Sequence, residues 1–213
     1  MAPNADPYEL AMFPLGSVLF TSMVLPLHLF EPRYLKLAED VLGGGREFGV
    51  VLIERGSEVG GGEVRSSVGT VAQVLEEHQF DDGRWALGSV GTRRIRVVEW
   101  LEDAPYPRAM VVDFPEVTEF SAPEIVRDTL ADCESQLRRA VDRLVRLGEV
   151  PAGVELEISE DPALASHQIS ALGPFGPSDR QDLLSCDGAA ERLELLDGLL
   201  DDAIAMLDFR LAE

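Results

Sequence analysis

The first half of the chain, from Leu10 to about Phe114, carries short apolar runs separated by turn residues. Residues 48–53, FGVVLI, form a continuous apolar run with the length and composition of a buried strand. At 81–83, Asp-Asp-Gly separates two further runs, and Asp-Gly indicates a tight hairpin because its turn requires positive φ. Several short strands at such intervals predict a barrel or a curled sheet.

Residues 93–97, RRIRV, alternate basic and apolar side chains. This period of two predicts a strand with one buried face, on which Ile95 and Val97 face a core while Arg94 and Arg96 face outward. We expect Gly91-Thr92 to make a turn before this strand, because glycine commonly punctuates strands.

The segment 30–34, Phe-Glu-Pro-Arg-Tyr, marks a change from strand to helix. Pro32 suits the first turn of a helix, where its missing N–H would have no partner in any case. Tyr34, Ala38 and Val41 then recur at helical spacing, and three glycines at 43–45 end the pattern. We therefore expect a strand that leads into a short helix through this segment.

After Ser121 the apolar residues recur at steps of three and four, which predicts helices. Ser121-Ala122-Pro123-Glu124 has the pattern of a capping box, and a long amphipathic helix should follow it to about Gly148. Further helices are predicted from Asp161-Pro162, over 178–185, and after a capping Asp187.

Strands come first and helices afterwards, which is the order of an α+β protein. We expect residues 1–9 to form a flexible N-terminus, 10–118 a β-barrel with one short helix, and 119–213 a helical subdomain. The boundary is placed between Pro115 and Pro123 because the period of the apolar residues changes there.

Acidic residues outnumber basic ones in both halves, 39 to 18 over the whole chain, and the net charge is −21. A polyanion such as nucleic acid would meet repulsion over most of the surface, whereas basic or unfolded polypeptides would be attracted. An acidic surface that only maintains solubility would produce the same composition. The charge therefore makes a nucleic-acid partner unlikely and leaves polypeptide partners open.

No apolar run reaches the roughly 18 residues that a membrane-spanning helix needs. The first eight residues lack the basic and apolar regions of a secretory signal. Cys133 and Cys186 are too few for a disulfide framework and lack metal-ligand spacing, so we expect two buried thiols. The expected location is the cytoplasm, and no membrane partner is expected.

Motifs for catalysis or cofactor binding are not apparent in the sequence. The glycines at 43–45 precede Arg46 rather than the lysine of a phosphate-binding loop, and Lys36 suits a solvated helix position. The acidic pairs at 81–82 and 201–202 suit a turn and a polar helix face. We therefore predict no catalytic, cofactor-binding or metal-binding residues.

The three histidines, His28, His78 and His167, match none of the spacings of metal-binding or catalytic motifs. We expect His28 on the strand face opposite its neighbouring leucines, His78 near a hairpin tip, and His167 on a polar helix face. Structural roles are favoured, but His28 or His167 could serve a small hydrolase.

Arg93, Arg94 and Arg96 form the only basic cluster in the sequence. These side chains could contact an anion or RNA, or they could neutralise acidic residues on the same sheet. The net charge and the absence of interleaved exposed aromatic residues favour neutralisation.

Several segments match, in order, the pattern of the Lon N-terminal (LON substrate-binding) domain family. They are Phe13-Pro14-Leu15, Leu25 to Tyr34, Phe48-Gly49-Val50, Val68 to Ala72, Asp82-Gly83-Arg84, Gly91 to Val97, and Pro105-Tyr106. The chain resembles this family most strongly from Leu10 to Phe114. The matching residues singled out here, all with expected structural roles, are Pro14, Phe30, Glu31, Pro32, Arg33, Tyr34, Gly69, Thr70, Gly91 and Arg94.

The resemblance implies a pseudouridine-synthase-and-archaeosine-like (PUA-like) β-barrel followed by an α-helical bundle. It also implies that Glu31 and Arg33 hold the strand-to-helix corner by hydrogen bonds or an ion pair. In full-length Lon proteases this region helps to recognise substrate proteins and precedes the ATPase and protease domains. Because this sequence shows neither of those domains, it resembles a stand-alone LON-domain protein.

The resemblance therefore predicts a non-catalytic module that binds proteins or peptides. Its partners would be unfolded polypeptides or a protease or chaperone, and it could be a monomer or a homodimer. Two alternatives remain open from the sequence. One is a small hydrolase of unknown substrate, and the other is an RNA-binding protein, because PUA-like barrels include RNA binders.

Overall fold

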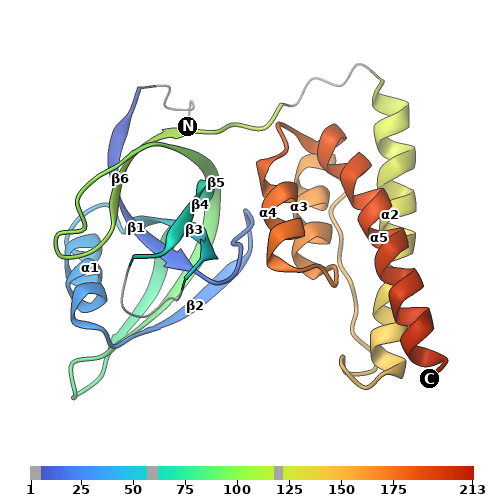
Figure 1. The fold of residues 1–213 in the computed structure, drawn as a ribbon, viewed down its shortest axis with the longest axis horizontal. Coiled ribbons are helices and arrows are strands. Elements are labelled where there is room, and N and C mark those ends of the chain that lie inside the picture. The colour runs from blue at the N-terminus through green and yellow to red at the C-terminus, as the bar shows by residue number, and fades with distance from the viewer. Residues whose placement is uncertain (1–5, 57–61, 118–121) are drawn as a thin grey trace. The chain divides into compact units, whose positions relative to one another are not determined.

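The computed structural model describes residues 6–56, 62–117 and 122–213. These ranges contain strands first and helices afterwards, the order expected of an α+β protein (Figure 1). The chain divides into two compact units, Met1–Pro115 and Glu116–Glu213. The first unit holds β1 (Tyr8–Leu15), β2 (Val24–Leu29), α1 (Pro32–Leu42), β3 (Glu47–Arg55), β4 (Val64–Gln79), β5 (Trp85–Trp100) and β6 (Arg108–Asp113). The second holds α2 (Pro123–Arg146), α3 (Pro162–Leu172), α4 (Pro177–Ser185) and α5 (Ala189–Leu211).

The strands of the first unit form one sheet in the order β2-β5-β4-β3-β1-β6. Strand β6 also pairs with β5, so the hydrogen-bonded strands β5, β4, β3, β1 and β6 form a closed ring. The long strand β5 makes this closure possible, since its first half pairs with β2 and its second half with β6. Among the described strands, β2 pairs only with β5 and lies outside the ring.

The hairpin predicted at Asp-Asp-Gly is present between β4 and β5, with Gly83 at a φ of 84°. The turn predicted at Gly91-Thr92 is wrong, because β5 continues through it. A Cβ on Gly91 would lie 2.3 Å from the carbonyl oxygen of Phe20. The N–H of Ser22 also donates to the carbonyl of Gly91 at 2.7 Å. Glycine is needed here so that a second backbone can approach, which the sequence pattern alone does not distinguish from a turn.

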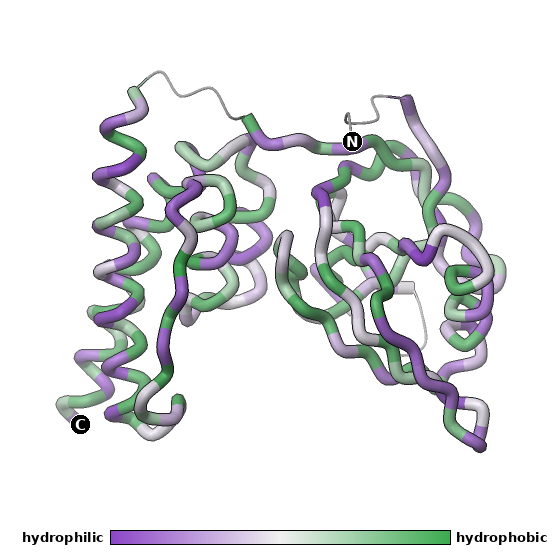
Figure 2. Tube along the Cα trace, turned by 180° about the vertical axis from the view of Figure 1, so that it is seen from behind, coloured by the Kyte–Doolittle hydropathy of each residue, from purple (hydrophilic) through white to green (hydrophobic). Residues whose placement is uncertain are grey.

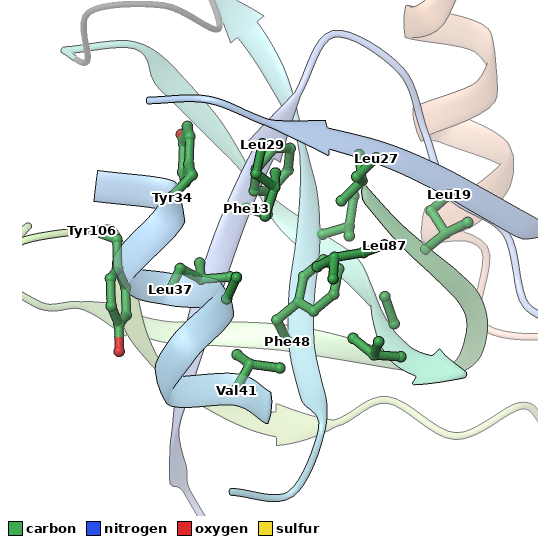
Figure 3. Packing of buried hydrophobic residues seen from close by; sticks show 14 residues of the cluster. Phe13, Leu19, Leu27, Leu29, Tyr34, Leu37, Val41, Phe48, Leu87 and Tyr106 are labelled. Carbon is green, nitrogen blue, oxygen red and sulfur yellow. The ribbon is translucent and has the colours of Figure 1, made fainter. Parts of the chain in front are cut away.

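Helix α1 covers the main core of the first unit (Figure 3). It begins at Pro32 and ends before Gly43, as the sequence predicts. Its buried face consists of Tyr34, Leu37, Ala38 and Val41. These side chains pack in one cluster with buried residues of the strands, among them Phe13, Leu29, Phe48 and Leu87.

In the second unit, two long amphipathic helices, α2 and α5, pack through their apolar stripes (Figure 2). The N-cap of α2 is Ala122 and makes no side-chain cap bond; Ser121, at which we predicted the capping box, lies outside the described residues. Asp161 caps α3 as predicted, since its carboxylate accepts the N–H of Leu164 at 2.9 Å. The N-cap of α5 is Gly188 rather than the predicted Asp187.

Both cysteines are free and buried, as predicted. The Cys133 thiol lies on α2 and donates to the carbonyl of Leu193 on α5 at 3.5 Å. No helix in the described ranges is long and apolar enough to cross a membrane.

Candidate functional site

A pocket of about 120 Å³ opens in the first unit where β1 ends, β2 ends and α1 begins. Most of its lining is apolar, with a few polar groups, which is the usual composition of a ligand pocket. The lining residues are Phe13, Pro14, Leu15, Leu27, His28, Leu29, Phe30, Glu31 and Tyr34. A larger surface depression, about 500 Å³, is lined by residues of α2 alone, all but one of which are polar or charged. The first pocket is therefore the candidate binding site.

The corner between β2 and α1 is held by charged and aromatic contacts. Glu31 is the N-cap of α1, and Pro32 follows it at the first helical position. The Arg33 Nε donates to the Glu31 carboxylate at 3.2 Å, and both side chains are largely buried. The Arg33 guanidinium also lies 4.5 Å from the centre of the Tyr34 ring. The ion pair expected between Glu31 and Arg33 is thus present, and it fixes one wall of the pocket.

Tyr34 lines the pocket and carries a buried hydroxyl. Its ring packs on Phe13 with 4.5 Å between ring centres, and the residue is 4% exposed (Figure 3). Its hydroxyl is buried and has no hydrogen-bond partner in the described part of the chain. Burial raises the pKa of Tyr34 to about 12, so the hydroxyl remains a neutral donor at physiological pH. A buried donor without an acceptor is unusual in a folded protein.

The outward face of β2 is exposed along its whole length. Val24 and Phe30 are 73% and 61% exposed, while Leu27 and Leu29, on the inward face, are buried. His28 also faces outward, as predicted, and stacks on Phe80 with 6.4 Å between ring centres. Exposed apolar side chains such as those of Val24 and Phe30 are a common feature of interaction surfaces.

Gly69 and Thr70 lie away from the pocket and serve the closed sheet. A Cβ on Gly69 would lie 2.3 Å from the carbonyl oxygen of Val50, so β3 and β4 could not pair at their present distance with a larger residue. The Thr70 hydroxyl is buried and donates to the carbonyl of Leu19 at 2.6 Å. These two motif residues hold the backbone together and do not contact the pocket.

The basic cluster of Arg93, Arg94 and Arg96 does not form an exposed basic surface, because acidic and aromatic side chains contact it. Arg93 donates to both Glu47 oxygens at 2.8 and 2.9 Å and to Asp113 at 3.1 Å. The prediction that Arg94 faces outward is wrong, since this residue is 2% exposed. Arg94 and Arg96 lie 4.1 and 4.3 Å from the ring centre of Phe114. Phe114, which follows β6, covers Arg94, and strand alternation alone could not reveal this contact.

The prediction of a polar-face position for His167 is also wrong, because the residue is 2% exposed. Its Nε2 lies 2.8 Å from the Glu116 carboxylate, which also accepts from the fully buried Arg192 at 2.9 and 3.2 Å. Burial by itself raises the pKa of Glu116, but the hydrogen bonds with His167 and Arg192 outweigh it and lower the pKa to about 2. This cluster ties the first residue of the second unit to α3 and α5.

The acidic pairs have structural roles. Asp82 forms an ion pair with Arg84 at 2.7 Å in the hairpin turn. Asp201 accepts from the side-chain amide of Gln136 at 3.0 Å, which joins α5 to α2. Lys36 is exposed and pairs with Asp40 at 2.8 Å. Within the described ranges, no three His, Cys, Asp or Glu side chains are arranged to hold a metal ion.

Comparison with known proteins gives a consistent result. The sequence profile of the ATP-dependent protease La (LON) substrate-binding domain matches residues 9–202. The Lon protease of Cytophaga hutchinsonii is 26% identical over 197 residues, which cover 91% of this chain and 24% of that protein. Lon protease 2 of Sorangium cellulosum is 29% identical over 205 residues, with the same coverage, 91% and 24%. The chain thus spans about a quarter of the length of these curated relatives.

Solved structures show the same fold. A Lon N-terminal domain protein from Xanthomonas campestris is 26% identical, with a TM-score of 0.62 over 89% of this chain and 96% of that chain. The N-terminal domain of the Mycobacterium avium complex Lon protease superposes with a TM-score of 0.58 at 18% identity and covers 92% and 99% of the two chains. The matched family is the substrate-binding domain of Lon and not its ATPase or protease domain. With its matching motifs, its sheet and its helical unit, the chain belongs to the LON substrate-binding domain family.

Proposed function

We propose that the protein is a non-catalytic module that binds extended or unfolded polypeptide segments through the pocket beside β2. The observation that carries this proposal is an apolar pocket at the end of a strand that has only one strand partner in the described sheet. Membership of a family described as substrate-binding supports it. A protease or chaperone would be a natural recipient of the bound polypeptide.

The size of the pocket indicates which groups it can hold. An apolar cavity of about 150 Å³ accommodates benzene, so a space of about 120 Å³ suits one aliphatic side chain. Full burial of such a side chain contributes roughly 1.5–3 kcal/mol. The net charge of −21 favours segments in which basic residues flank the apolar ones. Folded proteins keep most aliphatic side chains inside, so an unfolded chain is the better ligand.

We also propose that the closed sheet of the first unit is the PUA-like barrel implied by the sequence resemblance. An RNA-binding role is not favoured, because Arg93 is engaged by Glu47 and Asp113 and Arg94 is buried. A hydrolase that uses His167 is not favoured either, because that imidazole is buried against Glu116.

The proposal can be tested with lysozyme, a basic protein, in two forms. Reduced and alkylated lysozyme is permanently unfolded, whereas native lysozyme is folded and has a similar charge. Fluorescence anisotropy at physiological salt should show saturable binding of the unfolded form only. Saturable binding to neither form, or equal binding to both, contradicts the proposed function.

A pair of matched variants can locate the site. Phe30→Ser removes an aromatic side chain that is 61% exposed at the rim of the pocket, and Phe209→Ser removes one that is 68% exposed on α5. Phe30→Ser should weaken binding of unfolded lysozyme about 5-fold or more, since loss of roughly 1 kcal/mol of apolar contact corresponds to that factor. Phe209→Ser should leave the affinity unchanged. Equal losses from both variants would place the binding site elsewhere.

A further inference from the structure

We infer that the ligand binds as an added β-strand: an extended polypeptide pairs with the open edge of β2 and places one aliphatic side chain in the adjacent pocket. This inference rests on the proposed function and specifies how the site recognises its ligand. In strand addition, main-chain hydrogen bonds supply affinity and pockets for alternate side chains supply specificity.

The direction of the backbone groups of β2 follows from one hydrogen bond. In an antiparallel pair, alternate residues direct both N–H and C=O toward the partner strand, and the residues between them direct theirs away. The carbonyl of Met23 accepts the N–H of Gly91 at 2.9 Å, so it points toward β5. The pairing from Val24 to Leu29 continues without a register shift. Val24, Pro26 and His28 therefore direct their backbone groups to the open edge.

Pro26 agrees with this assignment, because proline has no N–H and is tolerated in a strand where that position faces away from the sheet. The open edge consequently offers three carbonyls but only two donors, the N–H groups of Val24 and His28. A gap in the row of donors limits how long a chain can pair there, which is a common protection of edge strands against aggregation. The edge thus suits a short segment.

The pocket lies at the His28 end of this edge. His28 and Phe30 line it, so a strand that pairs with His28 brings its own side chains to the opening. Leu27, Leu29 and Tyr34 also line the pocket, so an aliphatic side chain of the added strand meets mostly apolar walls there.

A second copy of this chain is a poorer occupant of the edge than a basic peptide. Each copy carries a net charge of −21, so two copies repel each other. A strand that alternates aliphatic and basic residues instead directs its aliphatic side chains to the pocket side and its basic ones to the opposite face.

The test uses a fluorescein-labelled octapeptide that alternates leucine and arginine, together with eight versions that each carry one N-methylated amide. N-methylation removes one N–H and changes neither the charge nor the side chains. Strand addition predicts that methylation at every second residue weakens binding at least 10-fold, while the residues between tolerate it. This scan uses the unmodified protein, so it does not depend on the folding of any variant.

Two substitutions at one position test the edge of β2 itself. His28→Pro removes the outward-facing N–H and should weaken peptide binding at least 10-fold. His28→Ala keeps this N–H and removes the imidazole that lines the pocket, so it reports the side-chain contribution alone, and His28→Pro should bind the peptide at least 10-fold more weakly than His28→Ala.

Three outcomes would overturn the inference. The first is an N-methyl scan without a two-residue period, and the second is equal binding by His28→Pro and His28→Ala. The third is a peptide-free dimer, seen by sedimentation, that His28→Pro dissociates, because a second copy would then occupy the edge. In each case binding of unfolded lysozyme decides separately whether the proposed function stands.

Discussion

Replacing Glu116 by glutamine should destabilise the helical unit by about 3 kcal/mol at pH 7. Glu116 accepts two hydrogen bonds from Arg192, whose side chain is fully buried, and lies 2.8 Å from His167. The carboxylate is the charged partner of this buried guanidinium in the described structure, and its side chain is 19% exposed. Glutamine keeps an acceptor but leaves the buried positive charge without a counter-charge.

The magnitude follows from the pKa of Glu116. These contacts lower the pKa from its ordinary 4.5 to about 2. At roughly 1.4 kcal/mol for each pH unit, this difference corresponds to about 3 kcal/mol. Loss of one partner from a buried ion pair typically costs about 3–5 kcal/mol, and the value obtained from the pKa lies at the lower end of this range.

The sign of the pH dependence provides a sharper test. Because the pKa is lower in the folded state, the stabilisation is fully present above pH 4.5 and is lost as the pH falls from 4.5 toward 2. Glu116→Gln lacks this titration. The difference in unfolding free energy between wild type and Glu116→Gln should therefore narrow from about 3 kcal/mol at pH 7 toward zero near pH 2.

Urea unfolding can follow the two units separately. Both tryptophans, Trp85 and Trp100, lie in the first unit, whereas α2 to α5 dominate the helical ellipticity at 222 nm. Glu116→Gln should lower the midpoint of the ellipticity change and leave that of tryptophan fluorescence in place. Glu149→Gln, which breaks an exposed ion pair with Arg210, is the matched control and should leave the midpoint of the ellipticity change nearly unchanged, because exposed ion pairs contribute little to stability. The ion-pair explanation would be refuted if the difference in unfolding free energy between wild type and Glu116→Gln did not depend on pH, or if it were no larger than that between wild type and Glu149→Gln.

Three further predictions concern single buried groups. Gly91→Ala should lower the free energy of unfolding measured by tryptophan fluorescence by about 2 kcal/mol or more, because its Cβ would lie 2.3 Å from the Phe20 oxygen. Gly45→Ala, with open space around its Cβ, should change that free energy by less than about 0.5 kcal/mol. Ionisation of tyrosine can be followed by absorbance at 295 nm as the pH is raised. Because burial raises the pKa of Tyr34 to about 12, Tyr34→Phe should reduce the absorbance change near pH 12 and leave the change near pH 10 intact. A smaller absorbance change near pH 10 in Tyr34→Phe would contradict the burial of this hydroxyl. Burial raises the pKa of the Cys133 thiol to about 12, so a disulfide reagent at pH 8 should modify it only after the helical unit unfolds, and rapid modification of the folded protein would contradict the packing.

Elements whose signals are local were predicted well from the sequence. Pro32 begins α1 and Asp161 caps α3, because the helix start depends on the residues of one turn. The hairpin at 81–83 is equally local, since its glycine adopts the positive φ that the turn requires. The family resemblance was also readable, because its motifs consist mostly of such turns, corners and buried strands.

Errors arose where distant segments meet. The local pattern predicts a turn at Gly91, since it holds no sign of the Phe20 backbone, which approaches from a segment 71 residues away in sequence. It likewise predicts outward positions for Arg94 and His167, because their contacts with Phe114 and Glu116 come from other segments. Alternation and helical period describe one element at a time, whereas burial of a polar residue depends on what a second element brings to it.

The candidate site shows the same division. The sequence by itself determined the order of elements, the strand-to-helix corner at 30–34 and membership of a domain family, because these depend on backbone preferences and short-range spacing. Only the tertiary structure decided that the sheet closes between β5 and β6, that β2 keeps an open edge in the described sheet, and that a pocket lined by His28 and Tyr34 lies beside it. The physical reason is that strand pairing and burial are properties of contacts between segments far apart in the chain, and no single segment records its partner.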